Sequence, residues 1–302
     1  MFKAFGFYKF IKIKSLNKDK DFLQKFLLSN NIRGTIIIAK EGLNGTISGS
    51  VKDIDKTIKK LKTLFSFKKF DSSNESNSKF QPFHKLKVKI KKEIVPMNLT
   101  INSKERNMET HLDPKKWNKL IKNKDTHIID TRKPFEYKVG TFKKSINPNV
   151  ANFRDFPKYL NKVEKTKPIA MFCTGGIRCE KTSVYLKKKG FKNIYQLSGG
   201  ILNYLKKIKK TESLWKGECF VFDNRISLKH GLKLGTHSIC SGCRMPISPK
   251  DKRSNKFEEG VSCSNCHDNL TDTQKSRFRM RQSQIYKAKK SRKKYIFQKE
   301  FK

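Results

Sequence analysis

The apolar residues of this chain repeat at every second position in some segments and at helical spacing in others, and this alternation limits the folds available to it. Residues 5–13 (FGFYKFIKI) alternate as a strand does. The apolar positions of residues 18–31 and 51–65 fall on one face of a helix. Three further strands are predicted from β-branched or alternating segments, within residues 32–40, 41–50 and 84–95. The first part of the chain therefore has the order β-α-β-β-α-β.

That order is typical of a ferredoxin-like or acylphosphatase-like α+β domain. We expect this domain to span residues 1–98. The polar tract DSSNESNSK (residues 71–79) predicts a flexible loop inside it. A linker at residues 99–112 is expected to follow.

Strands and helices alternate again from residue 113 to residue 212, which is typical of a parallel α/β domain. Buried strands are predicted at residues 126–132 and 167–172, and the segment FEYKVG (residues 135–140) predicts a loop between them. The predicted fold class is thus an α+β domain, a parallel α/β domain and a small cysteine-rich C-terminal segment.

His111 and Asp113 stand two positions apart, as two ligands of a non-haem iron site can do. The alternative is that Asp113 caps a helix whose first residue is Pro114. Aspartate before proline is a common helix start. We favour the helix cap.

The segment IAMFCTGGIRCEK (residues 169–181) carries the strongest chemical signal. Cys173 stands where a predicted buried strand ends, and Gly175 and Gly176 let the backbone curl before a helix begins. Successive N–H groups and the helix N-terminus then favour an anion at the centre of the loop. A cysteine in that position has a depressed pKa, and Arg178 adds positive charge.

Only four residues separate Cys173 from Arg178, whereas cysteine phosphatases need a loop wider by one residue. The narrower loop suits a persulfide and is typical of rhodanese domains. Cys179 either resolves an oxidised or persulfidated Cys173 or packs beneath the loop. We predict a catalytic set and a set of loop residues: Cys173, Arg178 and Cys179, and Thr174, Gly175, Gly176 and Ile177.

Three charged residues flank this loop in the predicted α/β domain. Asp130 and Arg132 follow the end of a strand, where the sites of α/β proteins collect, and Glu136 lies in the next loop. Anchoring of the loop by hydrogen bonds and ion pairs is at least as good an interpretation for all three as catalysis.

Two cysteine pairs in residues 213–270 predict a metal site. Nineteen residues separate Cys240-x2-Cys243 from Cys263-x2-Cys266, which is close to the spacing of a zinc ribbon. His267 could replace one cysteine. Four protein ligands leave no open position, so a zinc ion here would be structural. A basic helical tail is expected at residues 271–302, with disorder in its last residues.

The chain has 70 Lys and Arg against 26 Asp and Glu, a formal net charge of +44. Such a charge attracts polyanions, nucleic acids among them. Lys, Asn, Ile and Phe are abundant together, as in proteins of AT-rich genomes, so the charge permits RNA binding but does not demonstrate it.

Other classes of function are disfavoured by what the sequence lacks. It has no run of 18 apolar residues, so we expect no membrane span, and no G-x-G-x-x-G motif, so no nucleotide cofactor is evident. Seven cysteines, four of them in CxxC pairs, are typical of a reduced, cytoplasmic protein with metal-binding or catalytic thiols.

Four motifs together resemble a known family. They are EGLNGT, MFCTGGIRCEKTSVYL, YQLSGGILNYL and FVFDNRI, which begin at residues 41, 171, 195 and 220. The chain resembles the bacterial tRNA uridine hydroxylase family over roughly residues 5–285. The resemblance implies a rhodanese fold for residues 113–212 and an active cysteine at Cys173. The C-terminal segment of the family is longer and richer in cysteine, so the metal prediction rests on the spacing in this chain.

The resemblance also implies an activity, the oxygen-dependent hydroxylation of the wobble uridine of tRNA (position 34) to 5-hydroxyuridine. Molecular oxygen would be the co-substrate and the anticodon loop of tRNA the partner. The residues themselves support a thiolate that can carry sulfur, so a sulfurtransferase with a persulfide on Cys173 is the alternative. An RNA-binding scaffold with an inactive loop is a third hypothesis, which the intact loop residues argue against.

Overall fold

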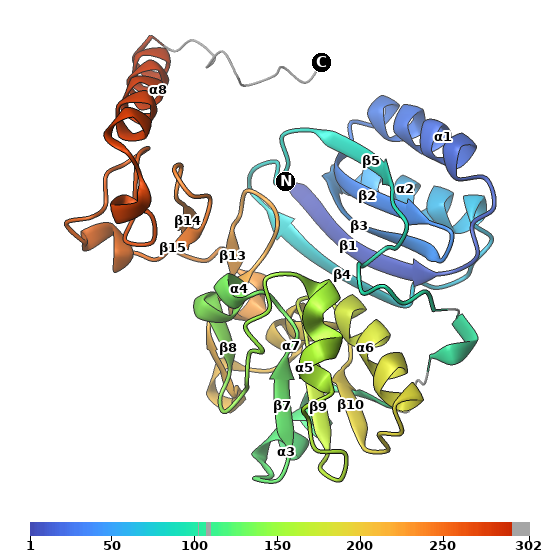
Figure 1. Cartoon of the computed structure of the whole chain (residues 1–302). Coiled ribbons are helices and arrows are strands. Elements are labelled where there is room, and N and C mark those ends of the chain that lie inside the picture. Colours follow the sequence, from blue (N-terminus) through green and yellow to red (C-terminus); the bar gives the residue numbers. More distant parts are fainter. Residues whose placement is uncertain (102, 107–109, 292–302) are drawn as a thin grey trace.

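The computed structural model describes residues 1–101, 103–106 and 110–291. The first domain is a five-stranded sheet in the order β4-β1-β3-β2-β5 with two helices (Figure 1). Its elements are β1 (Phe2–Phe10), α1 (Leu16–Ser29), β2 (Arg33–Ala39), β3 (Gly42–Gly49), α2 (Val51–Leu64), β4 (Ser72–Ser78) and β5 (Leu86–Ile90).

The polar tract of residues 71–79 forms a strand, so its prediction as a flexible loop was wrong. β4 pairs antiparallel with β1 along the edge of the sheet, from Phe2 opposite Ser78 to Tyr8 opposite Ser72. The segment predicted as the fourth strand is instead the fifth, β5, which lies parallel to β2 at the other edge. The tract has no apolar residue, so its period of two could not be seen in the hydrophobic pattern.

Alternate residues of the central strands face opposite sides of this sheet. Phe5, Ile36 and Leu43 pack against Leu23 of α1 and Ile54 of α2 in one hydrophobic core. The opposite face carries polar side chains and is turned toward the second domain. The first domain is therefore covered by helices on one face and by another domain on the other.

The second domain is a four-stranded parallel sheet in the order β6-β10-β9-β7, flanked by helices (Figure 1). Its elements are β6 (His111–Leu112), α3 (Pro114–Lys122), β7 (His127–Asp130), α4 (Pro134–Val139), β8 (Gly140–Phe142), α5 (Phe156–Leu160), β9 (Ile169–Phe172), α6 (Ile177–Lys188), β10 (Ile194–Leu197) and α7 (Gly200–Lys207).

β9 lies between β10 and β7 and is buried along its whole length. Its even-numbered residues, such as Phe172, pack with Trp117 of α3 and Tyr204 of α7, whereas Met171 packs with Phe156 of α5 and Leu186 of α6. Helices thus cover both faces of the sheet, as expected for a parallel sheet.

Two local features of this domain bear on the sequence predictions. Asp113 caps α3 by accepting hydrogen bonds from the N–H groups of Lys115 and Lys116, at 2.9 and 3.2 Å, as predicted. Residues 135–140, predicted as a loop, belong largely to the short helix α4. This helix begins at Pro134, and Glu136 accepts the N–H of Lys133, which explains why a helix forms there.

The strands and the α-helix that follow in the described residues, up to residue 291, are short strands and one long helix. They are β11 (Trp215–Gly217), β12 (Cys219–Phe220), β13 (Ser227–Leu228), β14 (Ser238–Ile239), β15 (Pro246–Ile247) and α8 (Asp272–Lys290). β11 pairs with β8 and so joins this segment to the second domain.

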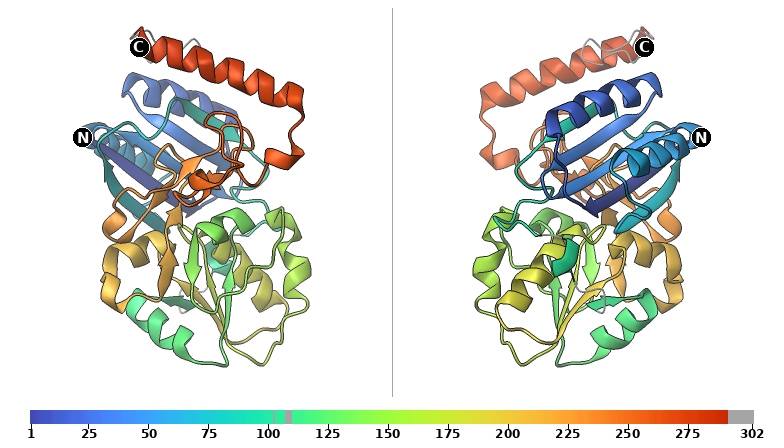
Figure 2. Two further views of the ribbon diagram at one scale, coloured as in Figure 1. Left: turned by 90° about the vertical axis from the view of Figure 1, so that its left-hand side faces the viewer. Right: turned by 90° about the vertical axis from the view of Figure 1, so that its right-hand side faces the viewer.

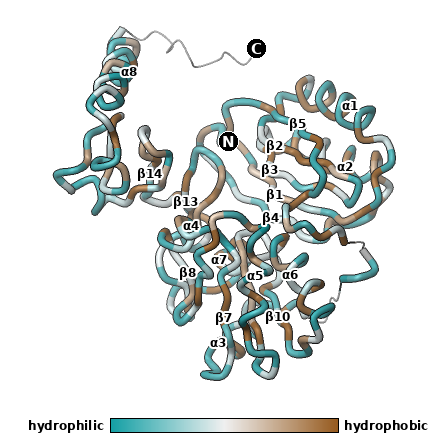
Figure 3. The backbone as a smooth tube through the Cα atoms, in the orientation of Figure 1, coloured by the Kyte–Doolittle hydropathy of each residue, from teal (hydrophilic) through white to brown (hydrophobic). Residues whose placement is uncertain are grey.

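α8 has no buried residue and extends away from both domains (Figures 1 and 2). Its colour in Figure 3 is mostly hydrophilic, in contrast to the strands of the two domains. The disorder predicted for the last residues of the tail lies outside the described residues. None of the helices in the described residues has the length and hydrophobicity needed to cross a bilayer.

Candidate active site

The predicted nucleophile lies at the carboxyl end of a central strand. Cys173 follows β9 directly, and the chain then curls through Gly176 at φ 103° into α6. The Sγ atom of Cys173 accepts a hydrogen bond from the N–H of Gly176 at 3.1 Å. The backbone thus presents hydrogen-bond donors to the sulfur, as the glycine pair and the helix start predicted.

Cys173 and Cys179 are neighbours in the structure, and both are buried. Burial raises the pKa of Cys173, but a hydrogen bond with the Cys179 thiol, the charge of Arg178 and N–H groups of the loop outweigh it and lower the pKa. Burial and the Cys173 thiolate raise the pKa of Cys179. Cys173 is therefore the thiolate and Cys179 its protonated hydrogen-bond donor.

Cys179 also has a partner beneath the loop. Its Sγ atom lies 3.7 Å from Oγ1 of Thr131, which donates a hydrogen bond to the carbonyl of Phe172 at 3.0 Å. Of the two roles left open by the sequence, packing under the loop is what the contacts of Cys179 describe. Because Cys179 lies next to Cys173, it could also react with an oxidised or persulfidated Cys173, which is the other role.

Arg178 is held in place by Glu136. Its guanidinium donates two hydrogen bonds to the Glu136 carboxylate, at 2.8 and 3.0 Å, and lies 3.5 Å from the Thr174 hydroxyl. Burial raises the pKa of Glu136, but the charge of Arg178 overcomes it and lowers the pKa. Glu136 thus anchors the arginine that lowers the pKa of Cys173.

Asp130 and Arg132 form a buried anchor beside the loop. The guanidinium of Arg132 donates to both carboxylate oxygens of Asp130, at 2.8 and 2.6 Å, and to the carbonyl of Gly140 at 2.6 Å. Both side chains are fully buried. Their contacts fit the anchoring interpretation.

The turn before α7 supports the loop from its other side. The N–H groups of Ile201 and Leu202 donate to the carbonyls of Cys173 and Thr174, at 3.0 and 3.2 Å. Gly200 has φ 67°, and a Cβ atom there would lie 2.5 Å from the Cys173 carbonyl oxygen. The SGG turn is therefore close to the loop because only glycine fits there.

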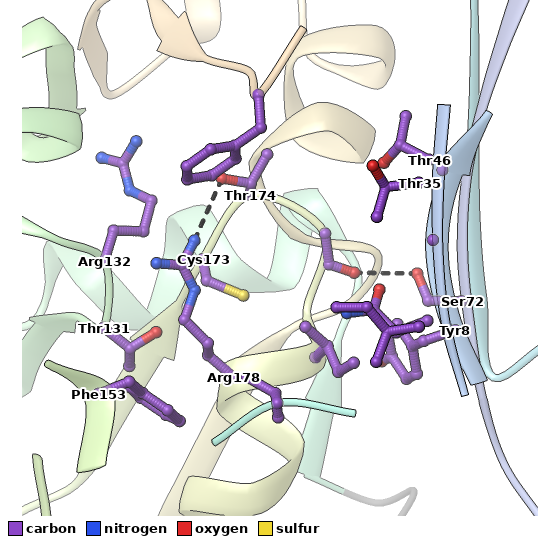
Figure 4. Close-up of a pocket in the computed structure, with 18 of the residues that line it drawn as sticks. Tyr8, Thr35, Thr46, Ser72, Thr131, Arg132, Phe153, Cys173, Thr174 and Arg178 are labelled. Atoms are coloured by element: carbon purple, nitrogen blue, oxygen red, sulfur yellow. Dashed lines mark hydrogen bonds between the residues drawn. The ribbon is translucent and has the colours of Figure 1, made fainter. Parts of the chain in front are cut away.

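A cavity of about 620 Å³ opens between the two domains, and Cys173 lies in its wall (Figure 4). In Figure 4 the sulfur of Cys173 points toward the sheet of the first domain, from which Thr35, Thr46, Ser72 and Tyr8 extend. Phe153, Arg154, Lys133 and Phe222 also line the cavity. This volume accommodates a small organic ligand or a single nucleotide unit.

The polar strand β4 holds the catalytic loop against the first domain. Its alternate residues point to one side. Ser72 donates to the carbonyl of Gly175 and Asn74 to the carbonyl of Gly199, both at 3.1 Å. Ser76, next in the series, accepts a hydrogen bond from Arg225 at 2.6 Å. The strand missed by sequence reasoning thus contacts the loop, the SGG turn and the FVFDNRI motif.

Glu180, on the first turn of α6, was not predicted as a site residue. Its Oε1 atom accepts hydrogen bonds from Tyr8 at 2.9 Å and Arg106 at 2.7 Å, and lies 3.0 Å from Nε2 of His111. Burial raises the pKa of Glu180, but hydrogen bonds from His111 and Arg106 lower it to about 2. His111 therefore belongs to a contact between the domains, not to an iron site with Asp113.

Lys181 makes a second contact across the domain boundary. Its Nζ atom lies 2.8 Å from Glu41 and 2.7 Å from Glu93, and the lysine side chain is fully buried. Glu41 begins the EGLNGT motif and Lys181 ends CTGGIRCEK. The sequence shows that each of the two motifs contains a charged residue, and this was the only indication of the ion pair. A single sequence does not show which charged residues pair with each other.

The four predicted metal ligands come together. The sulfur atoms of Cys240, Cys243, Cys263 and Cys266 all lie within 4.8 Å of one another. Two of these separations are 3.9 Å (Cys240 to Cys266) and 3.7 Å (Cys243 to Cys263). His267, the alternative ligand, contacts Asp268 instead. The cluster can bind a metal ion.

Each of the two domains matches a known family model. Residues 2–94 match the family model described as the UPF0176 acylphosphatase-like domain, and residues 113–207 match the rhodanese-like domain. A solved rhodanese-related protein of Thermoplasma volcanium is 24% identical over 32% of this chain and 91% of that one, with a TM-score of 0.28.

Two curated relatives match nearly the whole chain. A protein of Pelagibacter ubique (strain HTCC1062) named tRNA uridine(34) hydroxylase is 72% identical over 302 residues, 100% of both chains. A protein of Teredinibacter turnerae with the same name is 43% identical over 281 residues, 92% of this chain and 87% of the relative. At this identity and coverage the chain belongs to the tRNA uridine(34) hydroxylase family.

Proposed function

We propose that this chain hydroxylates C5 of the wobble uridine of tRNA, at position 34, to give 5-hydroxyuridine. The observation that carries the proposal is the Cys173 thiolate in the wall of a cavity of about 620 Å³ between the two domains. Family membership directs this geometry toward uridine 34. A base in an anticodon loop can be splayed out to enter such a cavity.

The thiolate of Cys173 is suited to attack at C6 of the uracil ring. Bond formation between sulfur and C6 moves the electron pair of the C5–C6 double bond onto C5 and O4, which makes C5 nucleophilic. Molecular oxygen is the proposed oxidant. One of its atoms enters at C5 and the other leaves as water, with two electrons from a cellular reductant and two protons from solvent. Loss of the C5 proton then expels the thiolate.

The other loop residues have defined parts in this proposal. Arg178 stabilises the thiolate and the negative charge that develops on the ring. Cys179 donates its hydrogen bond to Cys173 and holds the proton of the pair. The backbone of Thr174, Gly175, Gly176 and Ile177 shapes the anion cradle between them.

The tRNA would be bound by its phosphates and by stacking. Lys133 and Arg154 line the cavity beside Phe153 and Phe222, and the Phe222 side chain is 64% exposed. Cations of this kind neutralise phosphates, and aromatic rings stack on unpaired bases. Binding of the anticodon loop and a cytoplasmic location are parts of the same proposal.

We also propose that the cysteine cluster holds a structural zinc ion. Zinc bound tetrahedrally to thiolates at about 2.3 Å places the sulfur atoms about 3.8 Å apart. The separations of 3.7 and 3.9 Å in the cluster fit this value. All four ligands come from the protein, so the ion would stabilise the segment around β14 and β15 and take no part in the reaction.

Nucleoside mass spectrometry of tRNA tests the proposed activity. In a strain that lacks this protein, tRNA should lose 5-hydroxyuridine at position 34, and expression of the parent chain should restore it. Cys173→Ala should fail to restore it, although Cys219→Ala, which removes another buried thiol, should succeed.

The same measurement separates hydroxylation from sulfur transfer. Loss of a thiolated nucleoside, with 5-hydroxyuridine unchanged, would replace the proposal with the sulfurtransferase hypothesis. In that case the purified protein should gain the mass of one sulfur atom on Cys173 after incubation with a sulfur donor.

A further inference from the structure

The cavity wall opposite Cys173 is a regular polar surface on the sheet of the first domain. The register of the strands places two cross-strand rows on this face. One row runs through Thr35, Thr46, Gly6 and Asn74. The next row runs through Ile37, Asn44, Tyr8 and Ser72. All eight residues line the cavity.

The polar residues toward the β4 end of these rows already form hydrogen bonds within the protein. Ser72 and Asn74 on β4 bond to the catalytic loop and the SGG turn, and Tyr8 bonds to Glu180. These contacts explain the polarity of β4 and its neighbour without a ligand. They do not explain the polar side chains of β2 and β3.

In the part of the chain that the structure describes, three polar atoms farther along the rows have no protein partner. Among the described residues, the hydroxyls of Thr35 and Thr46 make no hydrogen bond. Asn44 donates from Nδ2 to the carbonyl of Ile94 at 3.1 Å, and this fixes the orientation of its amide. The Oδ1 atom of Asn44 is then the acceptor left over, because a flipped amide would set two acceptors against each other.

We propose that this surface recognises the edge of the uracil ring, with Asn44 Oδ1 accepting the N3–H group and Thr35 and Thr46 donating to a carbonyl oxygen. The inference rests on the proposed function and extends it, because it assigns base selection to the first domain. Asn44 and Thr46 belong to the EGLNGT motif, whose Glu41 already meets Lys181.

The hydrogen-bond pattern selects uracil over cytosine. Uracil presents a donor at N3 and an acceptor at C4, whereas cytosine presents an acceptor at N3 and a donor at C4. A fixed acceptor such as Asn44 Oδ1 would repel the N3 atom of cytosine. The threonine hydroxyls can rotate to donate or accept, so they add affinity more than discrimination.

Gly6 leaves space for the ring in front of this surface. A Cβ atom at Gly6 would lie 3.6 Å from Thr46 Oγ1 and 4.0 Å from the backbone oxygen of Asn74, which are ordinary van der Waals contacts, so no side chain stands above Gly6 and none of its neighbours crowds the position. Strands lie about 4.8 Å apart, so Thr46 stands roughly 10 Å along the row from Asn74, where the catalytic loop is attached. A planar base can lie over Gly6 between the two.

Binding of anticodon stem-loop RNAs that carry either U34 or C34 tests the inference. The parent chain should bind the U34 RNA about tenfold more tightly than the C34 RNA. Asn44→Leu should abolish this preference, and Thr46→Val should weaken U34 binding about five- to tenfold. Thr63→Val, the same change on the exposed surface of α2, should leave binding unchanged.

Activity and stability measurements keep the outcomes distinct. Melting temperatures of the Thr46→Val and Asn44→Leu proteins verify that they fold, and Thr35→Val serves as an independent variant. If folded Asn44→Leu keeps the parent preference for U34, or if folded Thr35→Val and Thr46→Val bind U34 RNA as tightly as the parent, the inference is wrong, even if the parent modifies uridine. If the parent forms no 5-hydroxyuridine at all, the proposed function is wrong instead.

Discussion

Cys173 is buried yet has a lowered pKa, so neighbouring groups must stabilise its charge. These groups are Cys179, the Arg178 guanidinium and the N–H groups of the loop. The position of Cys173 in a glycine-containing loop before a helix, with Arg178 adding positive charge, predicted the thiolate. The sequence did not predict that Cys179 donates a hydrogen bond to this thiolate. A cysteine that packs beneath the loop and a cysteine that resolves an oxidised Cys173 would both stand at this position of the helix, so the sequence does not separate the two roles.

Removing Arg178 should raise the pKa of Cys173. A thiolate reacts with iodoacetamide and a thiol does not, so the alkylation of Cys173 rises with pH through its pKa. In Arg178→Met the midpoint of this rise should move upward by about one to two pH units. Peptide mass spectrometry across a pH series measures it.

Two comparisons give this prediction its control. Cys219→Ala should leave the Cys173 midpoint where the parent has it. A midpoint in Arg178→Met equal to that of the parent would show that Cys179 and the loop backbone set the pKa without the charge of Arg178.

Glu180 should make the stability of the protein depend on pH in acid. Its pKa is lowered to about 2 in the folded state, so its contribution is fully present above the unfolded value of 4.5. As pH falls from 4.5 toward 2 the carboxylate is protonated and the contribution is lost. The shift corresponds to about 3 kcal/mol of unfolding free energy.

Urea unfolding of the parent and Glu180→Gln proteins over this pH range tests the sign. Glu180→Gln should be less stable at pH 7, and the difference should shrink as the pH is lowered. A difference that stays constant would mean that the carboxylate has the same pKa in the folded and unfolded chains.

Among the elements, β4 shows most clearly where sequence reasoning failed. Apolar periodicity predicted β1, α1, α2 and β5 of the first domain, whereas β2 was predicted from its β-branched residues and β3 as a short strand after a turn. β4 has no such side chains, because Ser72, Asn74 and Ser76 face polar groups of other segments. A strand whose partners are backbone carbonyls has no hydrophobic signal.

α6 joins the domains through a buried lysine. Lys181→Met should destabilise the protein by about 3–5 kcal/mol, because it leaves the carboxylates of Glu41 and Glu93 close together without their cation. Thermal unfolding measures the loss. Lys167→Met, which removes an exposed ion pair with Glu164, should leave the melting temperature near that of the parent. If the two variants lowered the melting temperature equally, the burial of Lys181 would not explain its contribution to stability.

At the scale of the whole molecule, the sequence predicted the two folds but not the cavity between them. Each fold follows from its own periodicity, whereas the cavity depends on how the domains dock. The contacts that decide this, Glu180 with Tyr8 and Lys181 with Glu41, join residues more than 100 positions apart. One sequence gives no sign of which distant charges pair.

The cysteine cluster should behave as a separate metal-dependent unit. The purified chain should contain one zinc ion, and Cys243→Ser should reduce the zinc content. Removal of the ion by a chelator should increase amide hydrogen exchange in β14 and β15 and leave exchange in β9 unchanged. Elemental analysis and hydrogen-exchange mass spectrometry measure the two effects. Unchanged exchange in β14 and β15 would show that the segment folds without metal.

In the proposed reaction the Cys173 thiolate attacks a uridine held between the two domains. An anticodon stem-loop with 5-fluorouridine at position 34 tests it directly, because fluorine replaces the C5 proton whose loss completes the reaction. Mass spectrometry should find this RNA bound covalently to Cys173 in the parent chain and should find no adduct in Cys173→Ser. An adduct on another residue, or normal formation of 5-hydroxyuridine by Cys173→Ser, would contradict it.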